Sequence, residues 1–240
     1  KRLRNYPDPM EVMERYGSDA VRYYLMSSPV VRAENLRFSE KEVSEVSKKF
    51  INILSNVLSF YQLYSEFDDK RQPSGEHVLD AWILTRLNQT LETQTVAMEK
   101  YDLQTGARCL QGFVTDLSTW YVRRSRDRMK SEGDDRFEAL ATLRTVLDTC
   151  SKMLAPFMPF LAEIVYQGID GGFIAREDRL SVHLEDWPEV GEVDQVALDR
   201  MGEVRAVVSR ALDIREETGI AIKQPLAGMT IHIPSGELSD

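Results

Sequence analysis

The residues best suited to bind a ligand lie between Trp120 and Lys130, where aromatic and basic side chains follow one another. Positions 123–130 hold five basic residues against one acidic residue, Asp127. At 3.6 residues per helical turn, Trp120, Arg124 and Arg128 share one strip of a helix surface. Single-stranded RNA is bound by aromatic or guanidinium planes that stack on bases and by cations that hold phosphates. The segment therefore predicts an RNA contact through Trp120, Tyr121, Arg123, Arg124, Arg126 and Arg128.

A structural interpretation of the same segment stays open. Basic side chains near the end of a helix complement its dipole, and Asp127 can pair with Arg123 or Arg124. The indole of Trp120 is as well suited to the core as to base stacking. A second and weaker group of RNA-contact candidates lies on or near the polar side of another expected helix, where exposure to solvent is the ordinary state. This group consists of Lys48, Lys49 and Asn52.

Other chemistries find little support among the titratable residues. The pairs Asp68–Asp69 and Asp134–Asp135 suggest a hydrolytic site, but both lie in expected loops without a histidine or basic partner. The three histidines are scattered, and no cysteine or histidine cluster has the spacing of metal ligands. Cys109 and Cys150 lie in apolar helical patterns, which is typical of reduced thiols in a cytosolic protein.

Composition indicates a soluble globular protein. The 240 residues are 42% hydrophobic and 29% charged, with no apolar run near the roughly 18 residues that a membrane span needs. No secretory signal is visible, so we expect a cytoplasmic protein without a membrane partner. The net charge of −9 argues against non-specific binding to DNA or RNA, because phosphate contacts need a local positive potential.

Hydrophobic periodicity predicts an all-α fold in which helices with short connections form an antiparallel bundle. Gly17 should end a first short helix, and Ser18 or Asp19 should cap the next. Ser39 and Glu42 form a capping box that opens a long helix with Phe60, Tyr61 and Tyr64 on its apolar face. Pro156 and Pro159 should kink the last helical hairpin. The expected helices span about 10–16, 20–26, 39–64, 76–100, 102–130, 135–155, 160–166 and 195–218, and a short strand is expected at 229–233.

Several segments carry a resemblance, in collinear order over nearly the whole chain. Lys-Arg-Leu-Arg-Asn-Tyr-Pro-Asp-Pro at 1–9 is similar to the end of a Lys-Met-Ser-Lys signature loop, and 16–25 is similar to the Tyr-Gly-Ala-Asp-Ala-Leu-Arg segment that follows it in class I synthetases. The other segments are Trp-Tyr-Val-Arg-Arg-Ser-Arg-Asp-Arg at 120–128, Leu-Ala-Pro-Phe-Met-Pro-Phe-Leu-Ala-Glu at 154–163, Ser-Val-His-Leu-x-x-Trp-Pro at 181–188, and 211–226. Together they resemble isoleucyl-tRNA synthetases of the eukaryote-like type.

The resemblance implies three regions and a division of labour. Residues 1–45 would hold the end of the signature loop and a stem-contact unit, 46–188 the anticodon-binding bundle, and 189–240 a linker helix and the start of a C-terminal region. Lys1 would be the second lysine of the signature, and because Lys-Met-Ser does not precede it, we expect a piece of a longer enzyme. The bundle would hold the anticodon loop of tRNA(Ile) in register for aminoacylation elsewhere in the enzyme.

The same resemblance assigns the chemistry to parts outside this sequence. The parent enzyme would use ATP and Mg²⁺, edit mischarged valine in an inserted domain, and carry any zinc outside this chain, while this piece alone would catalyse nothing and bind no cofactor. Its partners would be tRNA(Ile) and the remaining domains of the synthetase. The main alternative is a helical module that binds proteins, which predicts an exposed apolar groove and indifference to RNA. A hydrolase built on the paired carboxylates is the third hypothesis.

Overall fold

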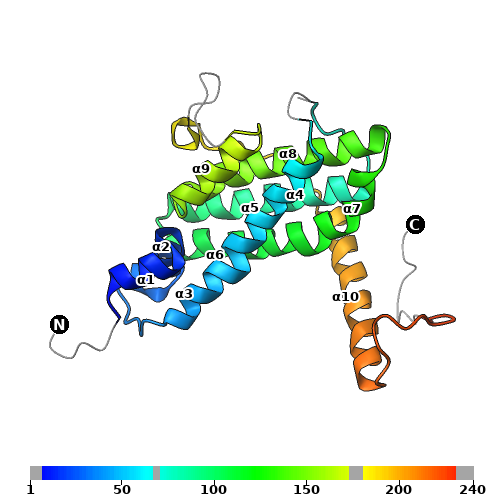
Figure 1. Cartoon of the computed structure of the whole chain (residues 1–240), viewed down its shortest axis with the longest axis horizontal. Coiled ribbons are helices and arrows are strands. Elements are labelled where there is room, and N and C mark those ends of the chain that lie inside the picture. The colour runs from blue at the N-terminus through cyan, green and yellow to red at the C-terminus, as the bar shows by residue number, and fades with distance from the viewer. Residues whose placement is uncertain (1–6, 67–70, 173–180, 231–240) are drawn as a thin grey trace. The chain divides into compact units, whose positions relative to one another are not determined.

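The protein is helical over most of residues 7–66, 71–172 and 181–230, which are the residues that this computed structural model describes (Figure 1). Two compact units divide the chain, Lys1–Val193 and Asp194–Asp240. No strand occurs within the described ranges, and the prediction of an all-α fold is confirmed. Lys1, the pair Asp68–Asp69 and residues 231–233 of the expected strand lie outside these ranges.

The first unit begins with three short helices, α1 (Pro9–Tyr16), α2 (Ser18–Met26) and α3 (Glu40–Val46), with the 3-10 turn η1 (Pro29–Arg32) between the last two. Val12, Ala20, Val21, Tyr24 and Val43 form their common core. Gly17 ends α1 at a φ of 86°, a conformation that favours glycine, as the sequence predicts.

The predicted cap of α2 is wrong, because Gly17 occupies the N-cap position and Ser18 is already helical. Asp19 is buried instead, and its Oδ2 accepts the backbone N–H of Leu161 at 2.7 Å. The Arg22 guanidinium donates to the carbonyl of Pro156 at 2.9 Å. The first bond ties α2 to the start of α9 (Pro159–Gly168) and the second ties it to the turn before α9, so the short helices and the bundle share one unit.

The predicted long helix after Ser39 exists, but a π-helical turn interrupts it. Ser39 caps α3 by accepting the N–H of Glu42, and the helix continues through η2 (Ser47–Ile51) into α4 (Asn52–Tyr64). Backbone angles on both sides of the π turn stay in the right-handed helical region. Phe50, Leu54, Val57 and Tyr61 are buried along this helix.

The remaining helices of the bundle match the predicted elements closely. They are α5 (Val78–Glu99), then α6 (Leu103–Asp116) continued by the π turn η3 (Leu117–Val122) into α7 (Arg123–Lys130), and α8 (Asp134–Leu154) followed by α9. Helix α5 packs on α6 and α8, and α8 packs on α7 and α9 (Figure 1). Trp82, Ile83, Leu110, Phe113 and Leu147 are among the buried side chains. Helix α8 ends at Leu154, and Pro159 is the first residue of α9, which confirms the predicted break.

The segment at residues 185–193 forms the C-terminal end of the first unit. It follows the 3-10 turn η4 (Val182–Leu184) and lies across α5, where Trp187 Nε1 donates to Thr95 Oγ1 and Asn88 Nδ2 donates to the Glu192 carbonyl. The second unit contains α10 (Gln195–Glu217), which Asp194 caps. Residues 229–230 of the expected strand are not in a strand.

Candidate nucleic-acid interface

The segment with the aromatic and basic residues forms the last part of one continuous helix, α6–η3–α7. Trp120 and Tyr121 belong to the π turn, and the five basic residues belong to α7. A π turn takes in one extra residue, and such turns often occur at functional sites. The segment presents two different faces, one toward solvent and one toward the helices α5 and α8.

The outer face pairs an aromatic ring with a cation. The Arg124 guanidinium lies over the Trp120 ring, 4.9 Å from its centroid. Arg123, Arg124 and Arg126 are exposed, and Trp120 is half-buried. The structure therefore keeps Trp120, Arg123, Arg124 and Arg126 accessible, and it brings Trp120 and Arg124 together as the helical spacing predicts.

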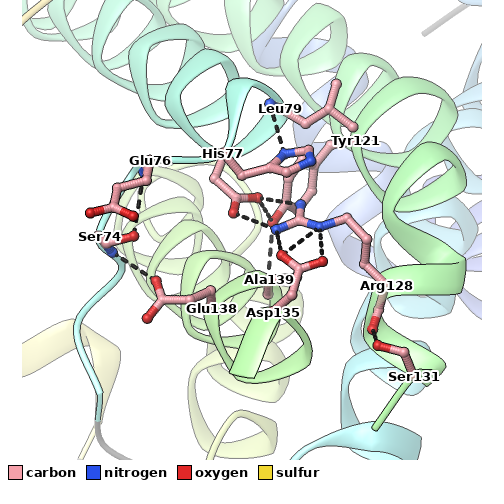
Figure 2. A network of polar contacts seen from close by, with 11 residues as sticks. Ser74, Glu76, His77, Leu79, Tyr121, Arg128, Ser131, Asp135, Glu138 and Ala139 are labelled. Carbon is pink, nitrogen blue, oxygen red and sulfur yellow. Dashed lines mark hydrogen bonds and ion pairs between the residues drawn. The ribbon is translucent and has the colours of Figure 1, made fainter. Parts of the chain in front are cut away.

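The inner face holds Tyr121 and Arg128, whose side chains the structure turns toward α5 and α8 and away from solvent. Arg128 is 13% exposed and binds Asp80 in a bidentate pair, with Nη1–Oδ1 at 3.0 Å and Nη2–Oδ2 at 2.9 Å. It also donates to Asp135, with Nη2–Oδ1 at 2.6 Å (Figure 2). Tyr121 is fully buried, and its hydroxyl donates to Asp80 Oδ1 at 2.8 Å, beside the Ala139 carbonyl. We call Asp80, Tyr121, Arg128 and Asp135 the Arg128 cluster.

The positions of these residues on their helices explain why the cluster forms. Asp80 and Asp135 lie in the first turns of α5 and α8, and Arg128 lies in the last turn of α7. A carboxylate near a helix N-terminus and a guanidinium near a helix C-terminus each interact favourably with the helix dipole. His77 completes the α5 end, because its Nδ1 accepts the N–H of Leu79 at 3.2 Å (Figure 2). One arginine thus joins three helix ends.

The charges of the cluster are stabilised in the folded state. Burial acts against the charge of Arg128, but its hydrogen bonds to Asp135 and Asp80 raise its pKa above the usual value. The hydrogen bond from Arg128 lowers the pKa of Asp135. Burial and the neighbouring Asp80 raise the pKa of Tyr121 well above its ordinary range, so its hydroxyl remains a donor. The Arg128 cluster therefore links α7 to α5 and α8 through charged groups.

The weaker candidates form a group of their own on another helix. Lys48 and Lys49 belong to the π turn η2, and Asn52 begins α4; all three are exposed. Lys49 forms an ion pair with Glu45 one turn earlier. The turn η2 packs on α6, whereas α4 packs on η3. Each of the two candidate groups therefore includes residues of a π turn.

Phe60, Tyr64 and Lys130 are neighbours of the outer face that the sequence did not single out. The Arg126 guanidinium lies 5.5 Å from the Phe60 ring centroid, and the Lys130 ammonium lies 5.9 Å from that of Tyr64. The sequence places Phe60, Tyr61 and Tyr64 together on an apolar face, but only Tyr61 is buried. Spacing accounts for part of this difference, because Phe60 and Tyr64 are four residues apart and share a face, whereas Tyr61 directly follows Phe60 and is turned from it.

The geometry of the described residues does not favour a hydrolytic or a metal-binding site. Asp135, from one of the carboxylate pairs, is bound by Arg128. Among the described residues, no three histidine, cysteine or acidic side chains gather as metal ligands would. Cys109 and Cys150 are unpaired thiols, and burial raises their pKa values to about 11 and about 12. In the same ranges, every helix is too short or too polar to cross a membrane.

One apolar hollow opens on the first unit, away from the candidate residues in sequence. Its volume is about 460 Å³, and α2 and the start of α9 supply most of its lining. Leu25, Met26 and Phe160 are among the lining residues, and Phe160 is exposed. This is the kind of surface that the interaction-module hypothesis requires.

Comparison with known proteins gives two family matches. Residues 80–230 match the anticodon-binding domain of tRNA ligase, and residues 1–37 match the class I tRNA synthetases (I, L, M and V). An isoleucine–tRNA ligase of Nocardia farcinica is 39% identical over 235 residues, which is 97% of this chain and 22% of that protein. One of Chlamydia trachomatis serovar L2 is 41% identical over 240 residues, or 96% of this chain and 23% of that protein.

A solved structure shares the fold. It is the ternary complex of Agrobacterium radiobacter K84 agnB2 LeuRS with tRNA and LeuAMS, which matches with a TM-score of 0.57 at 19% identity over 80% of this chain and 22% of that one. The chain spans less than a quarter of the length of the two isoleucine–tRNA ligases. Since the match at residues 80–230 covers more than half of the sequence, the chain belongs to the family of anticodon-binding domains of tRNA ligases.

Proposed function

We propose that this chain binds the anticodon loop of tRNA(Ile) as part of an isoleucine–tRNA ligase. The observation that carries the proposal is the Trp120–Arg124 pair, with Arg123 and Arg126 exposed beside it on a protein of net charge −9. A stacked ring and guanidinium accept a splayed base, and the neighbouring cations attract phosphates. Family membership and the two isoleucine–tRNA ligases support this assignment.

The proposed contact set is divided by role. Trp120, Arg123, Arg124 and Arg126 contact RNA, and Lys48, Lys49 and Asn52 are a second contact group. Tyr121 and Arg128 act as positioning residues, because they hold α7 against α5 and α8. The boundaries 1–45, 46–188 and 189–240 remain part of this proposal.

The parent enzyme would carry out the reaction with its other domains. Aminoacylation with ATP and Mg²⁺, editing and the role of Lys1 in the signature loop are proposed for that enzyme, in the cytoplasm. In this proposal the other domains of that enzyme hold the metal. This chain would bind the anticodon loop and so hold the tRNA in register for aminoacylation.

The test is binding of the 240-residue chain to tRNA(Ile) across a salt series, with fluorescence polarisation as the readout. The matched comparison is the same tRNA with only its anticodon replaced. We expect the replaced anticodon to bind at least about 5-fold more weakly, because stacking and base contacts are lost while phosphate contacts remain. Equal affinity for the two RNAs would show that binding is purely electrostatic and would refute anticodon recognition.

The second candidate function is contact with other protein domains. The apolar hollow beside Leu25, Met26 and Phe160 favours it, since exposed apolar surface often marks protein contacts. If Phe160→Ser leaves RNA binding unchanged and weakens assembly with the rest of the synthetase, the two functions belong to separate surfaces. If the chain ignores RNA at low salt, this candidate takes first place.

A further inference from the structure

Two aromatic rings on α4 lie next to the outer face of α7. Phe60 and Tyr64 are one helical turn apart, with ring centroids 4.9 Å apart and planes inclined by 51°. Both side chains are half-buried, so each ring keeps part of its surface in solvent. Helix α4 packs against η3, the turn that contains Trp120. The chain thus has three accessible aromatic rings on two neighbouring elements.

Each of the two α4 rings is covered by a cation from α7. Arg126 lies over Phe60 and Lys130 lies over Tyr64, and both pairs advance by four residues in the same direction. The two contacts therefore follow one another in the same direction along both helices. Arg126 and Lys130 are exposed, so both cations can leave the rings at little cost, because cation–π contacts are weak at exposed sites.

The arrangement matches what an unpaired RNA strand needs. A base stacks on any π face, and a phosphate needs a cation within reach of the same nucleotide. Each ring with its cation provides both functions at one place. An acidic peptide would use only the cations and leave the rings without a role, so the observations favour RNA over a protein ligand.

We propose that Phe60 and Tyr64 form a second stacking platform for unpaired bases of the RNA loop, next to Trp120 and Arg124. On binding, the bases take the places of Arg126 and Lys130 on the rings, and the two cations move to the phosphates. The inference rests on the proposed function, and it names the part of the surface that extends the contact beyond Trp120.

The experiment measures binding of the 240-residue chain to an anticodon stem-loop of tRNA(Ile), with the double variant Phe60→Leu and Tyr64→Leu. Leucine keeps the apolar contacts of the half-buried positions and removes the rings. We expect the affinity to fall by at least about 25-fold, since each lost stacked base weakens binding by roughly 5- to 100-fold and the variant removes two rings. The salt slope should not change, because the substitutions remove no charge.

Three comparisons make the result specific. Leu63→Ala is the matched control, since Leu63 is 72% exposed on the same helix, and its affinity should equal that of the unchanged chain. Arg126→Ala should lower the salt slope by about 0.7 to 1, because one phosphate contact is lost. Circular dichroism confirms that every variant is folded before it is compared.

The result that would overturn the stacking platform differs from the result that would overturn the proposed function. Unchanged affinity of the double variant, with weaker binding by Trp120→Ala, would overturn the platform and leave the proposed function standing. No binding of the unchanged chain to any stem-loop would overturn the proposed function as well. Binding of polyglutamate that also depends on the Phe60 and Tyr64 rings would overturn the assignment of RNA as the ligand.

Discussion

Arg124 and Arg128 lie one turn apart on α7, and they have opposite surroundings. Arg124 is exposed and covers the ring of Trp120, while Arg128 is mostly buried between Asp80 and Asp135. The two residues have the same chemistry and the same helical environment in the sequence. The difference comes from the partners that α5 and α8 bring to the inner face.

The comparison shows that a basic segment on an acidic protein need not have one purpose. Asp80 is only 2% exposed, and a carboxylate in that position is costly unless it is paired and hydrogen-bonded. Arg128 and Tyr121 meet this requirement, and they are committed to the fold as a result. In contrast, Arg123, Arg124 and Arg126 remain exposed, so a ligand can reach them.

The largest effect should come from Arg128→Ala. It leaves Asp80 buried without its bidentate partner, and breaking such a pair costs about 3 to 5 kcal/mol of unfolding free energy. Urea unfolding followed by circular dichroism measures the loss. Arg124→Ala is the matched control and should change stability by less than about 0.5 kcal/mol. Equal losses in the two variants would remove the distinction between the faces.

A smaller loss is expected for Tyr121→Phe. The variant keeps the buried ring and removes the hydroxyl that donates to Asp80, which should cost about 1.5 kcal/mol. The same urea assay detects it. In the Arg128→Ala background the effect should differ by at least about 0.5 kcal/mol, because the two residues share Asp80. Full additivity would mean that they do not act as one cluster.

Arg124→Ala should act on RNA binding where it does not act on stability. We expect the plot of log affinity against log salt to lose about 0.7 to 1 in slope, and affinity to fall by about 1 kcal/mol at low salt. Polarisation with the anticodon stem-loop is the measurement. Lys100→Ala, an exposed cation at the end of α5, is the charge-matched control. A slope that Arg124→Ala leaves intact would exclude Arg124 from the interface.

The smallest effect concerns the outer carboxylate of the Arg128 cluster. Arg128 lowers the pKa of Asp135 below its ordinary value of 3.8, so its contribution is complete above about pH 5 and is lost as the pH falls below 3.8. The Asp135 side chain is 55% exposed, and screening keeps the contribution below about 1 kcal/mol. Asp135→Asn should therefore be less stable than the unchanged chain at pH 7 and equal to it near pH 2, in unfolding measured at both values. A difference that grows toward acid would contradict this sign.

Much of the fold could be predicted because its signals are local. Gly17, Ser39 and Asp102 mark helix ends at the positions where the structure has them. The proline-rich break at 156–159 is also where the sequence places it. The two π turns could not be predicted, because the residues that flank them have ordinary helical backbone angles and their extra residue leaves no composition signal.

The candidate site was only partly predictable for a different reason. Helical spacing correctly paired Trp120 with Arg124, because four residues along a helix always bring side chains together. The same spacing added Arg128 to that strip, although its true partner, Asp80, is 48 positions away in the sequence. Periodicity places Phe60 and Tyr64 on the apolar face with Tyr61, but it does not indicate which of the three rings is buried.

The sequence by itself determined the helices, the helix ends at Gly17 and Ser39, the bundle class and the family, since each depends on short-range periodicity or on collinear motifs. Tertiary structure alone decided which cations of α7 are bound inside the protein and which face solvent. The physical reason is that the buried Asp80 on α5 must be neutralised by whichever cation the packing of α7 on α8 brings within hydrogen-bond distance. That choice depends on contacts between distant helices, and the spacing of residues along α7 does not contain it.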